Sequence, residues 1–135
     1  METSQVTYTG NLITEAIHLA SGTKIITDAP VDNHGQGSSF SPSDLLATSL
    51  ASCMFTVLGI ATETHGFSID GATAKVTKIM AAEPRRVIGI KVEMVFPANN
   101  YSNKEKEIIQ RIALTCPVAK SLHPDINQDI TFIFP

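Results

Sequence analysis

The longest apolar run of this 135-residue chain reads Ser41-Pro-Ser-Asp-Leu-Leu-Ala-Thr-Ser-Leu-Ala-Ser-Cys-Met-Phe-Thr-Val-Leu-Gly-Ile-Ala61. Its large apolar residues recur at spacings of three and four, and small or apolar residues fill the other faces, which predicts one long, largely buried helix. Ser41 is a good N-cap and Pro42 suits the first helical position. His65 followed by Gly66 predicts the end of the helix.

Strands and shorter helices surround this run in the sequence. Ser102 and Glu105 have the spacing of a capping box, which predicts a second helix. The pair Cys116-Pro117 predicts a further helical turn, with Cys116 at the cap. We therefore expect an α+β fold, mainly antiparallel, in a single domain over residues 1–135. The expected segments are a three-stranded meander over 3–28, a loop over 29–41, the central helix to residue 65, strands over 67–80 and 86–96, the two helices, and a strand over 126–134.

Composition excludes several classes of protein. The formal net charge is −3 and no Lys/Arg cluster is present, so nucleic acid is not an expected partner. Residues 1–6 lack a basic stretch before an apolar run, so we expect neither signal peptide nor anchor, and a cytoplasmic protein. Ser49, Ser52 and Thr56 interrupt the central helix, which argues against a membrane span. One small domain cannot cover so apolar a helix alone, so we expect a homodimer.

Cys53 and Cys116 are the only cysteines. They form no C-x-x-C motif, and in a chain without a signal peptide they are candidates for redox chemistry. Cys53 is either a small buried hydrophobe or a reactive thiol, and in mid-helix it needs a cation from elsewhere to be a thiolate. Cys116 either caps its helical turn or is the easier thiolate, because free backbone N–H groups at a helix start stabilise negative charge.

The four histidines do not have the spacing of a zinc site, so no metal and no cofactor is expected. Only His34 is a candidate site residue, because it lies in the long Gly-rich loop, and loops concentrate functional residues.

Two segments together resemble the OsmC/Ohr family of osmotically inducible and organic hydroperoxide resistance proteins. They are Ser-Pro-Ser-Asp-Leu-Leu-Ala-Thr-Ser-Leu-Ala-Ser-Cys53 and Thr-Cys116-Pro-Val-Ala-Lys-Ser-Leu-His123, with His65-Gly66-Phe67 between them. The resemblance covers most of the chain from residue 30 onward. It implies an intertwined homodimer in which antiparallel sheets surround a long buried central helix.

The resemblance also implies a function, the reduction of organic hydroperoxides in oxidative-stress defence. Cys53 would attack the hydroperoxide and become a sulfenic acid, and Cys116 would condense with it to a disulfide. A dithiol or lipoylated protein would then restore both thiols.

The sequence departs from the family in the residues that activate the thiolate. Family peroxidases usually carry an Arg among the N-terminal strands, whereas Lys24 is the only Lys or Arg in the first 74 residues here. Asp44 lies roughly 180° around a straight helix from Cys53 and about 13 Å along it, so it could act only through a bridging cation. Arg85, Arg86, Lys24 and His34 are the candidates for that cation, and the two arginines rank above Lys24 because a guanidinium can bridge a carboxylate and a thiolate. The alternative for this arginine pair is a solvated turn.

Two other functions stay open at this stage. One is an OsmC-like dimer without peroxidase activity that binds a small apolar ligand beside Cys53. The other is a redox sensor in which a disulfide between the two cysteines changes the affinity for a partner. A peroxidase requires one thiol that is readily ionised, and the absent N-terminal Arg is the feature that favours the alternatives.

Overall fold

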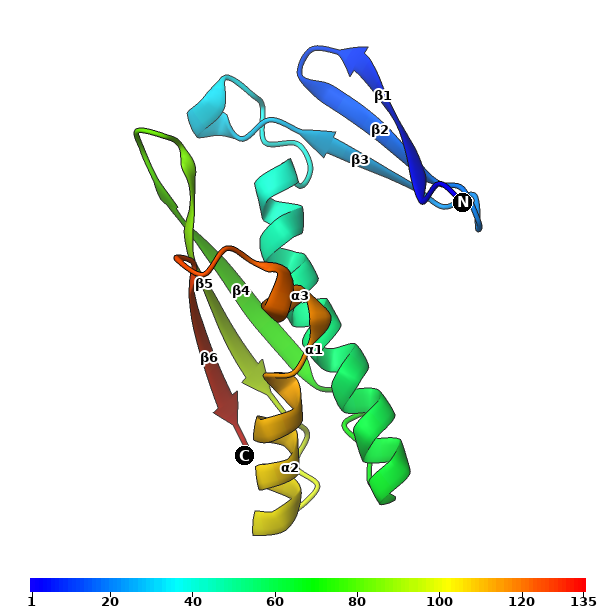
Figure 1. Ribbon diagram of the computed structural model, residues 1–135, viewed down its shortest axis with the longest axis vertical. Coiled ribbons are helices and arrows are strands. Elements are labelled where there is room, and N and C mark those ends of the chain that lie inside the picture. Colours follow the sequence, from blue (N-terminus) through cyan, green and yellow to red (C-terminus); the bar gives the residue numbers. More distant parts are fainter. The chain divides into compact units, whose positions relative to one another are not determined.

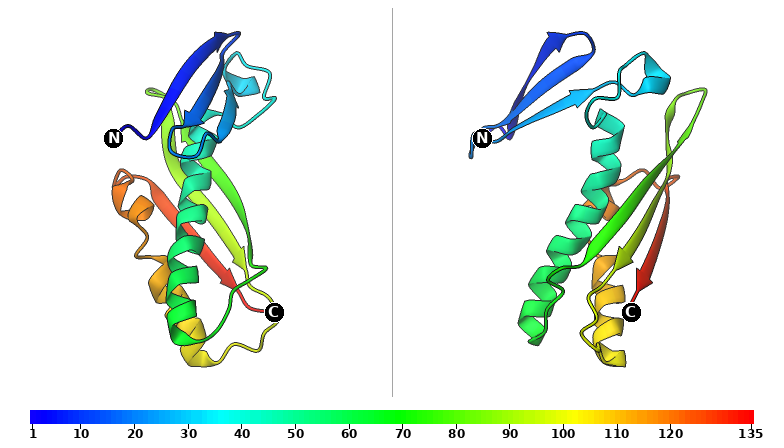
Figure 2. Two further views of the ribbon diagram at one scale, coloured as in Figure 1. Left: turned by 90° about the vertical axis from the view of Figure 1, so that its right-hand side faces the viewer. Right: turned by 180° about the vertical axis from the view of Figure 1, so that it is seen from behind.

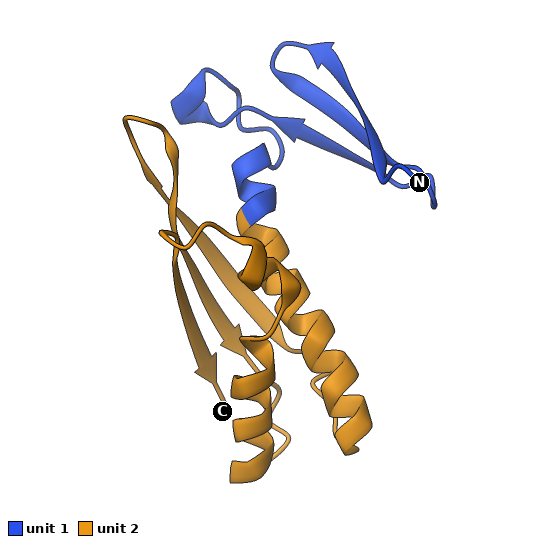
Figure 3. Cartoon of the chain, viewed as in Figure 1, with its two compact units in different colours: residues 1–46 blue, residues 47–135 orange.

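The computed structural model describes all 135 residues, and the chain forms two compact units, residues 1–46 and 47–135 (Figure 3). The boundary falls inside the long helix, between Leu46 and Ala47. The single domain expected from the sequence stays a prediction.

The α+β fold is confirmed, and the order of its elements is the expected one (Figure 1). A short 3₁₀ turn, η1 (Val31–Asn33), lies in the long loop. The elements are β1 (Ser4–Gly10), β2 (Ile13–His18), β3 (Lys24–Asp28), α1 (Pro42–His65), β4 (Thr73–Ala81), β5 (Arg86–Val95), α2 (Asn103–Ala113), α3 (Pro117–Ser121) and β6 (Asn127–Ile133).

Residues 1–46 contain the predicted meander, an antiparallel sheet in the order β1-β2-β3. The loop after β3 is tied to Asp28, whose side chain is almost fully buried. Ser38 donates to Asp28 Oδ2 from its backbone N–H at 3.0 Å and from its hydroxyl at 2.6 Å. Gly35 is required inside the loop because a Cβ there would lie 1.8 Å from the carbonyl oxygen of Ala29.

The start of α1 is capped as the sequence predicts. The Ser41 hydroxyl accepts the Asp44 N–H at 3.1 Å, and Asp44 Oδ2 accepts the Ser41 N–H at 2.9 Å. This is a reciprocal capping box in which Asp44 takes the place usually held by Glu or Gln. The same device opens α2, where Ser102 and Glu105 form the predicted box.

Residues 47–135 contain the second sheet, in the order β4-β5-β6. β4 and β5 are antiparallel, but β5 and β6 are parallel, so the expectation of mainly antiparallel pairing holds for only one of the two pairs in this sheet. The physical reason is the pair of helices between β5 and β6. They carry the chain back to the end of the sheet where β5 begins, as parallel pairing requires. Figures 1 and 2 show α1 and α2 on the same face of this sheet.

β4 is shorter than the predicted strand, because it begins at Thr73 rather than at Phe67. Gly66 and Gly71 both have positive φ angles, 79° and 91°, and they bracket a turn in which Ile69 is buried. The apolar residues of this segment therefore fill the core from a loop and not from a strand.

One face of α1 forms the core of this unit together with the inner face of the sheet. Leu50, Met54 and Leu58 are fully buried, and each contributes about 1.5–3 kcal/mol of hydrophobic free energy to folding. The other faces are more open than the sequence suggests, since Leu46 is 40% exposed and Ile60 is 66% exposed. The remaining core residues of this unit include Ala47, Ala51, Ile90, Val92, Met94, Phe96, Tyr101, Ile109, Ala113 and Cys116.

By length and composition, α1 could cross a membrane. The polar residues within it therefore do not exclude a membrane span, contrary to the expectation from the sequence. This is weak evidence for a membrane helix, because core helices of soluble proteins also pass the same test. Here the buried stripe of α1 belongs to the core that it shares with β5 and α2.

The hydrogen bonds from Ser38 hold the pKa of Asp28 below its ordinary value of 3.8. A carboxylate with a lowered folded-state pKa stabilises the fold above its unfolded pKa, and this contribution is lost as the pH falls through the folded value. We predict that Asp28→Asn lowers stability at pH 7 and flattens the loss of stability below about pH 4. Urea denaturation between pH 7 and pH 3 measures both effects. Parallel stability curves for the two proteins would contradict this role for Asp28.

Candidate active site

Cys53 lies on α1 at the edge of its buried stripe. The neighbouring Leu50 and Met54 are fully buried, which sets the rotation of the helix, and Cys53 is left half-buried beside them. Its thiol therefore borders apolar core on one side and remains partly accessible on the other.

Cys116 lies at the N-cap of α3, as predicted, and it is fully buried. Pro117 occupies the first turn, and the Ala119 backbone N–H donates to Cys116 Sγ at 3.2 Å. The preceding helix α2 delivers Cys116 into the core, because Ile109 and Ala113 on the same segment are fully buried.

The fold brings the two thiols together, although the chain separates them by two strands and a helix. Both are free, and they lie close enough together for Cys53 to raise the pKa of the Cys116 thiol. Two neighbouring free thiols, one half-buried and one fully buried, form a pair that can be oxidised to a disulfide and reduced again.

The expectation that Cys116 is the easier thiolate is wrong. Burial raises the pKa of the Cys116 thiol above its ordinary value of 9.0, and the neighbouring Cys53 raises it further. The Ala119 N–H acts in the opposite direction, but its effect on the pKa is smaller than that of burial. Burial outweighs the cap hydrogen bond because none of the Cys116 side chain is exposed to water, which disfavours the charged thiolate.

Three of the predicted activating residues lie in residues 1–46. Lys24 forms an exposed ion pair with Glu15 at 3.6 Å on the β2–β3 face. His34 is exposed at the end of η1 with a φ angle of 70°. Asp44 accepts the Ser41 N–H in the first turn of α1. Their role in the chemistry of Cys53 stays a prediction.

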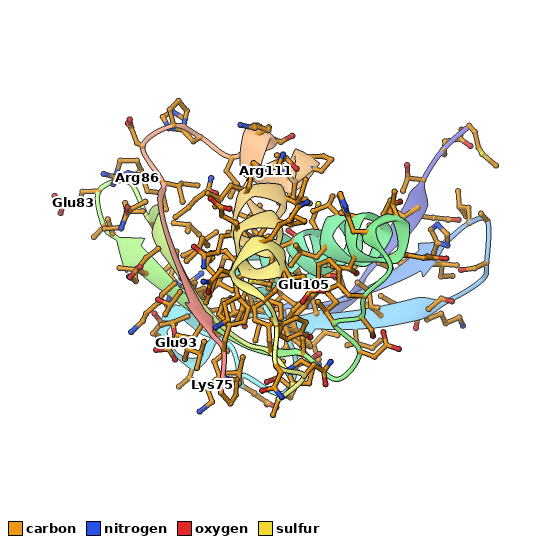
Figure 4. The ribbon with its side chains drawn as sticks, turned by 90° about the horizontal axis from the view of Figure 1, so that it is seen from below. Lys75, Glu83, Arg86, Glu93, Glu105 and Arg111 are labelled. Carbon is orange, nitrogen blue, oxygen red and sulfur yellow. The ribbon has the colours of Figure 1, made fainter.

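The two arginines lie at the hairpin between β4 and β5, and both are exposed. The Arg86 guanidinium donates to the carbonyl oxygens of Pro84 at 2.8 Å and Ala82 at 3.4 Å. Figure 4 shows Arg86 at the same end of the hairpin as Glu83. Arg86 therefore closes its own turn, whereas the activating role of either arginine stays a prediction.

The sequence analysis missed two polar residues on the inner face of the sheet. Lys78 shares this face of β4 with Val76 and Met80, and Gln128 occupies it on β6. Both pair with the fully buried Ile90, so the three residues form one row across the sheet. The alternation of β4 could have identified Lys78, since this lysine occupies a position on the side of the strand where Val76 and Met80 are apolar.

Comparison with known proteins agrees with this architecture. The sequence pattern of the OsmC-like protein family matches residues 35–131, and the chain therefore belongs to this family. None of the curated proteins compared with the chain matches it.

Solved structures show the same fold. A protein of Psychrobacter arcticus 273-4, described as a candidate osmotic stress induced and detoxification response protein, is 55% identical, with a TM-score of 0.94 and coverage of 98% of this chain and 96% of its own. The organic hydroperoxide resistance protein OsmC of Legionella pneumophila is 14% identical, with a TM-score of 0.76 and coverage of 98% of each chain. An organic hydroperoxide resistance protein of Elizabethkingia anophelis is also 14% identical, with a TM-score of 0.76 and coverage of 100% of this chain and 98% of its own.

The contact between the thiols predicts how Cys116 titrates when Cys53 is removed. Since burial and Cys53 both raise the pKa of Cys116, Cys53→Ala should lower this pKa. The pKa should remain above 9.0, because burial is the larger cause. Thiolate absorbance in the ultraviolet, followed against pH, measures it. A value below 9.0 would show instead that the Ala119 N–H outweighs burial.

Proposed function

We propose that this protein is a thiol peroxidase that reduces organic hydroperoxides in a stress-related redox role. The observation that carries the proposal is the proximity of two free thiols, one half-buried and one fully buried, within an OsmC-like fold. The description of the 55% identical Psychrobacter protein as a stress and detoxification protein supports the stress-related role. The apolar surroundings of Cys53 favour a hydroperoxide with an apolar organic group over hydrogen peroxide.

The reaction has three steps in which atoms and electrons balance. The Cys53 thiolate attacks the terminal oxygen of the hydroperoxide, the O–O bond breaks, and the alkoxide leaves and takes a proton to become an alcohol. The Cys116 sulfur then attacks the sulfenic acid of Cys53, and the hydroxyl group leaves as water with the proton of Cys116. A dithiol reduces the resulting disulfide and becomes a disulfide itself.

The exposures of the two sulfur atoms match these two roles. An external hydroperoxide can reach the half-buried Cys53, whereas Cys116 is fully buried and can react only with a neighbour inside the protein. The raised pKa of Cys116 keeps it protonated at neutral pH, so it does not compete for the hydroperoxide.

The direct test is consumption of cumene hydroperoxide with dihydrolipoamide as the dithiol. We predict turnover by the native protein and loss of activity by at least about 100-fold in Cys53→Ser, because a serine hydroxyl is not oxidised by a hydroperoxide. Cys116→Ser should still consume one equivalent of hydroperoxide in a single turnover. If the native protein consumes no hydroperoxide, the apolar ligand-binding or redox-sensor function becomes the better account.

A half-buried thiol in mid-helix requires a cation to react as a thiolate at neutral pH, and Lys78 is the candidate that the structure adds. Lys78 stands on the face of β4 that contributes Ala74 and Val76 to the core around α1. It is also in register with Gln128, which contacts the helix that carries Cys116 at its cap. The family resemblance implies an arginine held by a carboxylate, and Arg85 or Arg86 bridging to Asp44 is the sequence-based candidate for that route.

Substitution of these cations separates the two routes. We predict that Lys78→Met slows alkylation of Cys53 by iodoacetamide at pH 7 by about tenfold, in a Cys116→Ser background where only Cys53 reports. Lys78→Arg should retain most of the rate. Lys75→Met is the matched control, because Lys75 lies on the exposed face of the same strand. A slow rate in Arg85→Met with a normal rate in Lys78→Met would assign the role to the arginine.

We also propose that the functional protein is a homodimer. Large apolar side chains remain open on both units, including Val6 at 62%, Tyr8 at 65% and Ile60 at 66% exposure. Val6 and Tyr8 lie on the same face of β1, and β1 is an edge strand. A second copy of the chain would bury such surfaces and remove the cost of their contact with water.

Sedimentation at micromolar concentration tests the homodimer. We predict a stable dimer for the native protein and a weakened dimer for Ile60→Asp, since a buried unpaired charge at an interface costs several kcal/mol. Thr77→Asp is the control, because Thr77 lies on the exposed face of β4, opposite the face that packs against α1. A native protein that sediments as a folded monomer would contradict the proposal.

A further inference from the structure

Gln128 is a polar residue on an otherwise apolar strand face. It shares the inner face of β6 with Ile130 and Phe132, both of which pack against the core. Its side-chain amide Nε2 donates to the carbonyl oxygen of Ala119 in α3 at 3.0 Å, in a partly buried position. A polar side chain in such surroundings is costly unless it is hydrogen-bonded, so this contact fixes its orientation.

Ala119 is thereby held from both sides. Its carbonyl oxygen accepts from Gln128, and its N–H donates to Cys116 Sγ at 3.2 Å. α3 has five residues, none of them fully buried, and only Val118 and Ala119 among them pack against the core. A helix this short is not stable by itself, so its position depends on such contacts.

This inference rests on the proposed function. We propose that Gln128 is a positioning residue for disulfide formation, which holds α3, and through it the Cys116 sulfur, against Cys53. Gln128 touches neither sulfur. It acts through Ala119, and its effect falls on the step in which the sulfenic acid of Cys53 is converted to the disulfide. Holding two reacting atoms in contact accelerates such an intramolecular step.

The consequence is a competition between two fates of the sulfenic acid. In one, Cys116 attacks Cys53, and water leaves with the sulfenic hydroxyl and the Cys116 proton. In the other, a second hydroperoxide molecule transfers an oxygen atom to the sulfenic acid, which becomes a sulfinic acid while the hydroperoxide becomes an alcohol. Looser positioning of Cys116 lengthens the life of the sulfenic acid and favours the sulfinic acid, which dithiols do not reduce.

The test compares Gln128→Leu with the control Asn127→Leu, whose side chain lies on the exposed face of β6. After one equivalent of cumene hydroperoxide, we expect sulfenic acid to form at the native rate in Gln128→Leu, and the disulfide to form about threefold to tenfold more slowly, as for loss of one hydrogen bond. With excess hydroperoxide, the sulfinic acid of Cys53 should increase by a similar factor in mass spectra. The control should match the native protein in all three measurements.

A second measurement does not depend on peroxidase activity. At equilibrium with mixtures of reduced and oxidised dithiothreitol, the Cys53–Cys116 disulfide should be less favoured in Gln128→Leu by a similar factor. If this equilibrium shifts but hydroperoxide oxidises neither protein, the proposed function fails and the positioning role stands. Disulfide formation and equilibrium equal to those of the native protein, in a variant with native circular dichroism, would overturn the role of Gln128. Gln128→Glu, which keeps the shape and removes the donor, replaces Gln128→Leu if the latter does not fold.

Discussion

The packing of the α1 stripe against the inner face of the β4-β5-β6 sheet is the constraint on which the site depends. Leu50, Met54 and Leu58 are fully buried in one core with Ile90 and other residues of β5. Once these residues are inside, the rotation of α1 is fixed, and Cys53 must lie at the edge of the stripe. The same core receives Cys116 from the end of α2, so hydrophobic packing brings the two thiols close together.

Burial then gives the two sulfur atoms different chemistry. Cys53 keeps an exposed side, whereas the Cys116 thiol is removed from water and its pKa is raised. The backbone N–H of Ala119 offsets part of the cost of charge on Cys116 without making it a thiolate at neutral pH. A buried thiol whose sulfur accepts a hydrogen bond from a backbone N–H is suited to react with a sulfenic acid beside it. The same hydrogen bond helps the sulfur to leave when the disulfide is reduced.

Much of this architecture could be predicted from the sequence because its determinants are local. The cap at Ser41, the capping box at Ser102 and the cap at Cys116 each lie within four residues, and the structure contains all three. The parallel pairing of β5 with β6 could not be derived in this way, because it depends on where two helices return the chain. The raised pKa of Cys116 was mispredicted for a related reason, since the position of a cap is local but burial is a property of the whole core.

The residues of the candidate site also differ in whether local sequence is enough to find them. Both cysteines were identified from the chain, with the help of a family resemblance that the comparisons confirm. Lys78 could have been found from the alternation of its strand, but its place in one row with Gln128 depends on the register of the sheet, which the sequence does not give. The buried Asp28, which organises the loop before α1, was missed because its partner Ser38 is ten residues away in an irregular segment.

The most direct test of this account is peptide mapping of the native protein after one equivalent of an organic hydroperoxide, with free thiols blocked by rapid alkylation in acid. The account predicts a disulfide between Cys53 and Cys116 within a single chain, in nearly all molecules, and its disappearance after treatment with a dithiol. Recovery of both cysteines as alkylated thiols, or of disulfides only between chains, would contradict the claim that packing prepares these two sulfur atoms to bond.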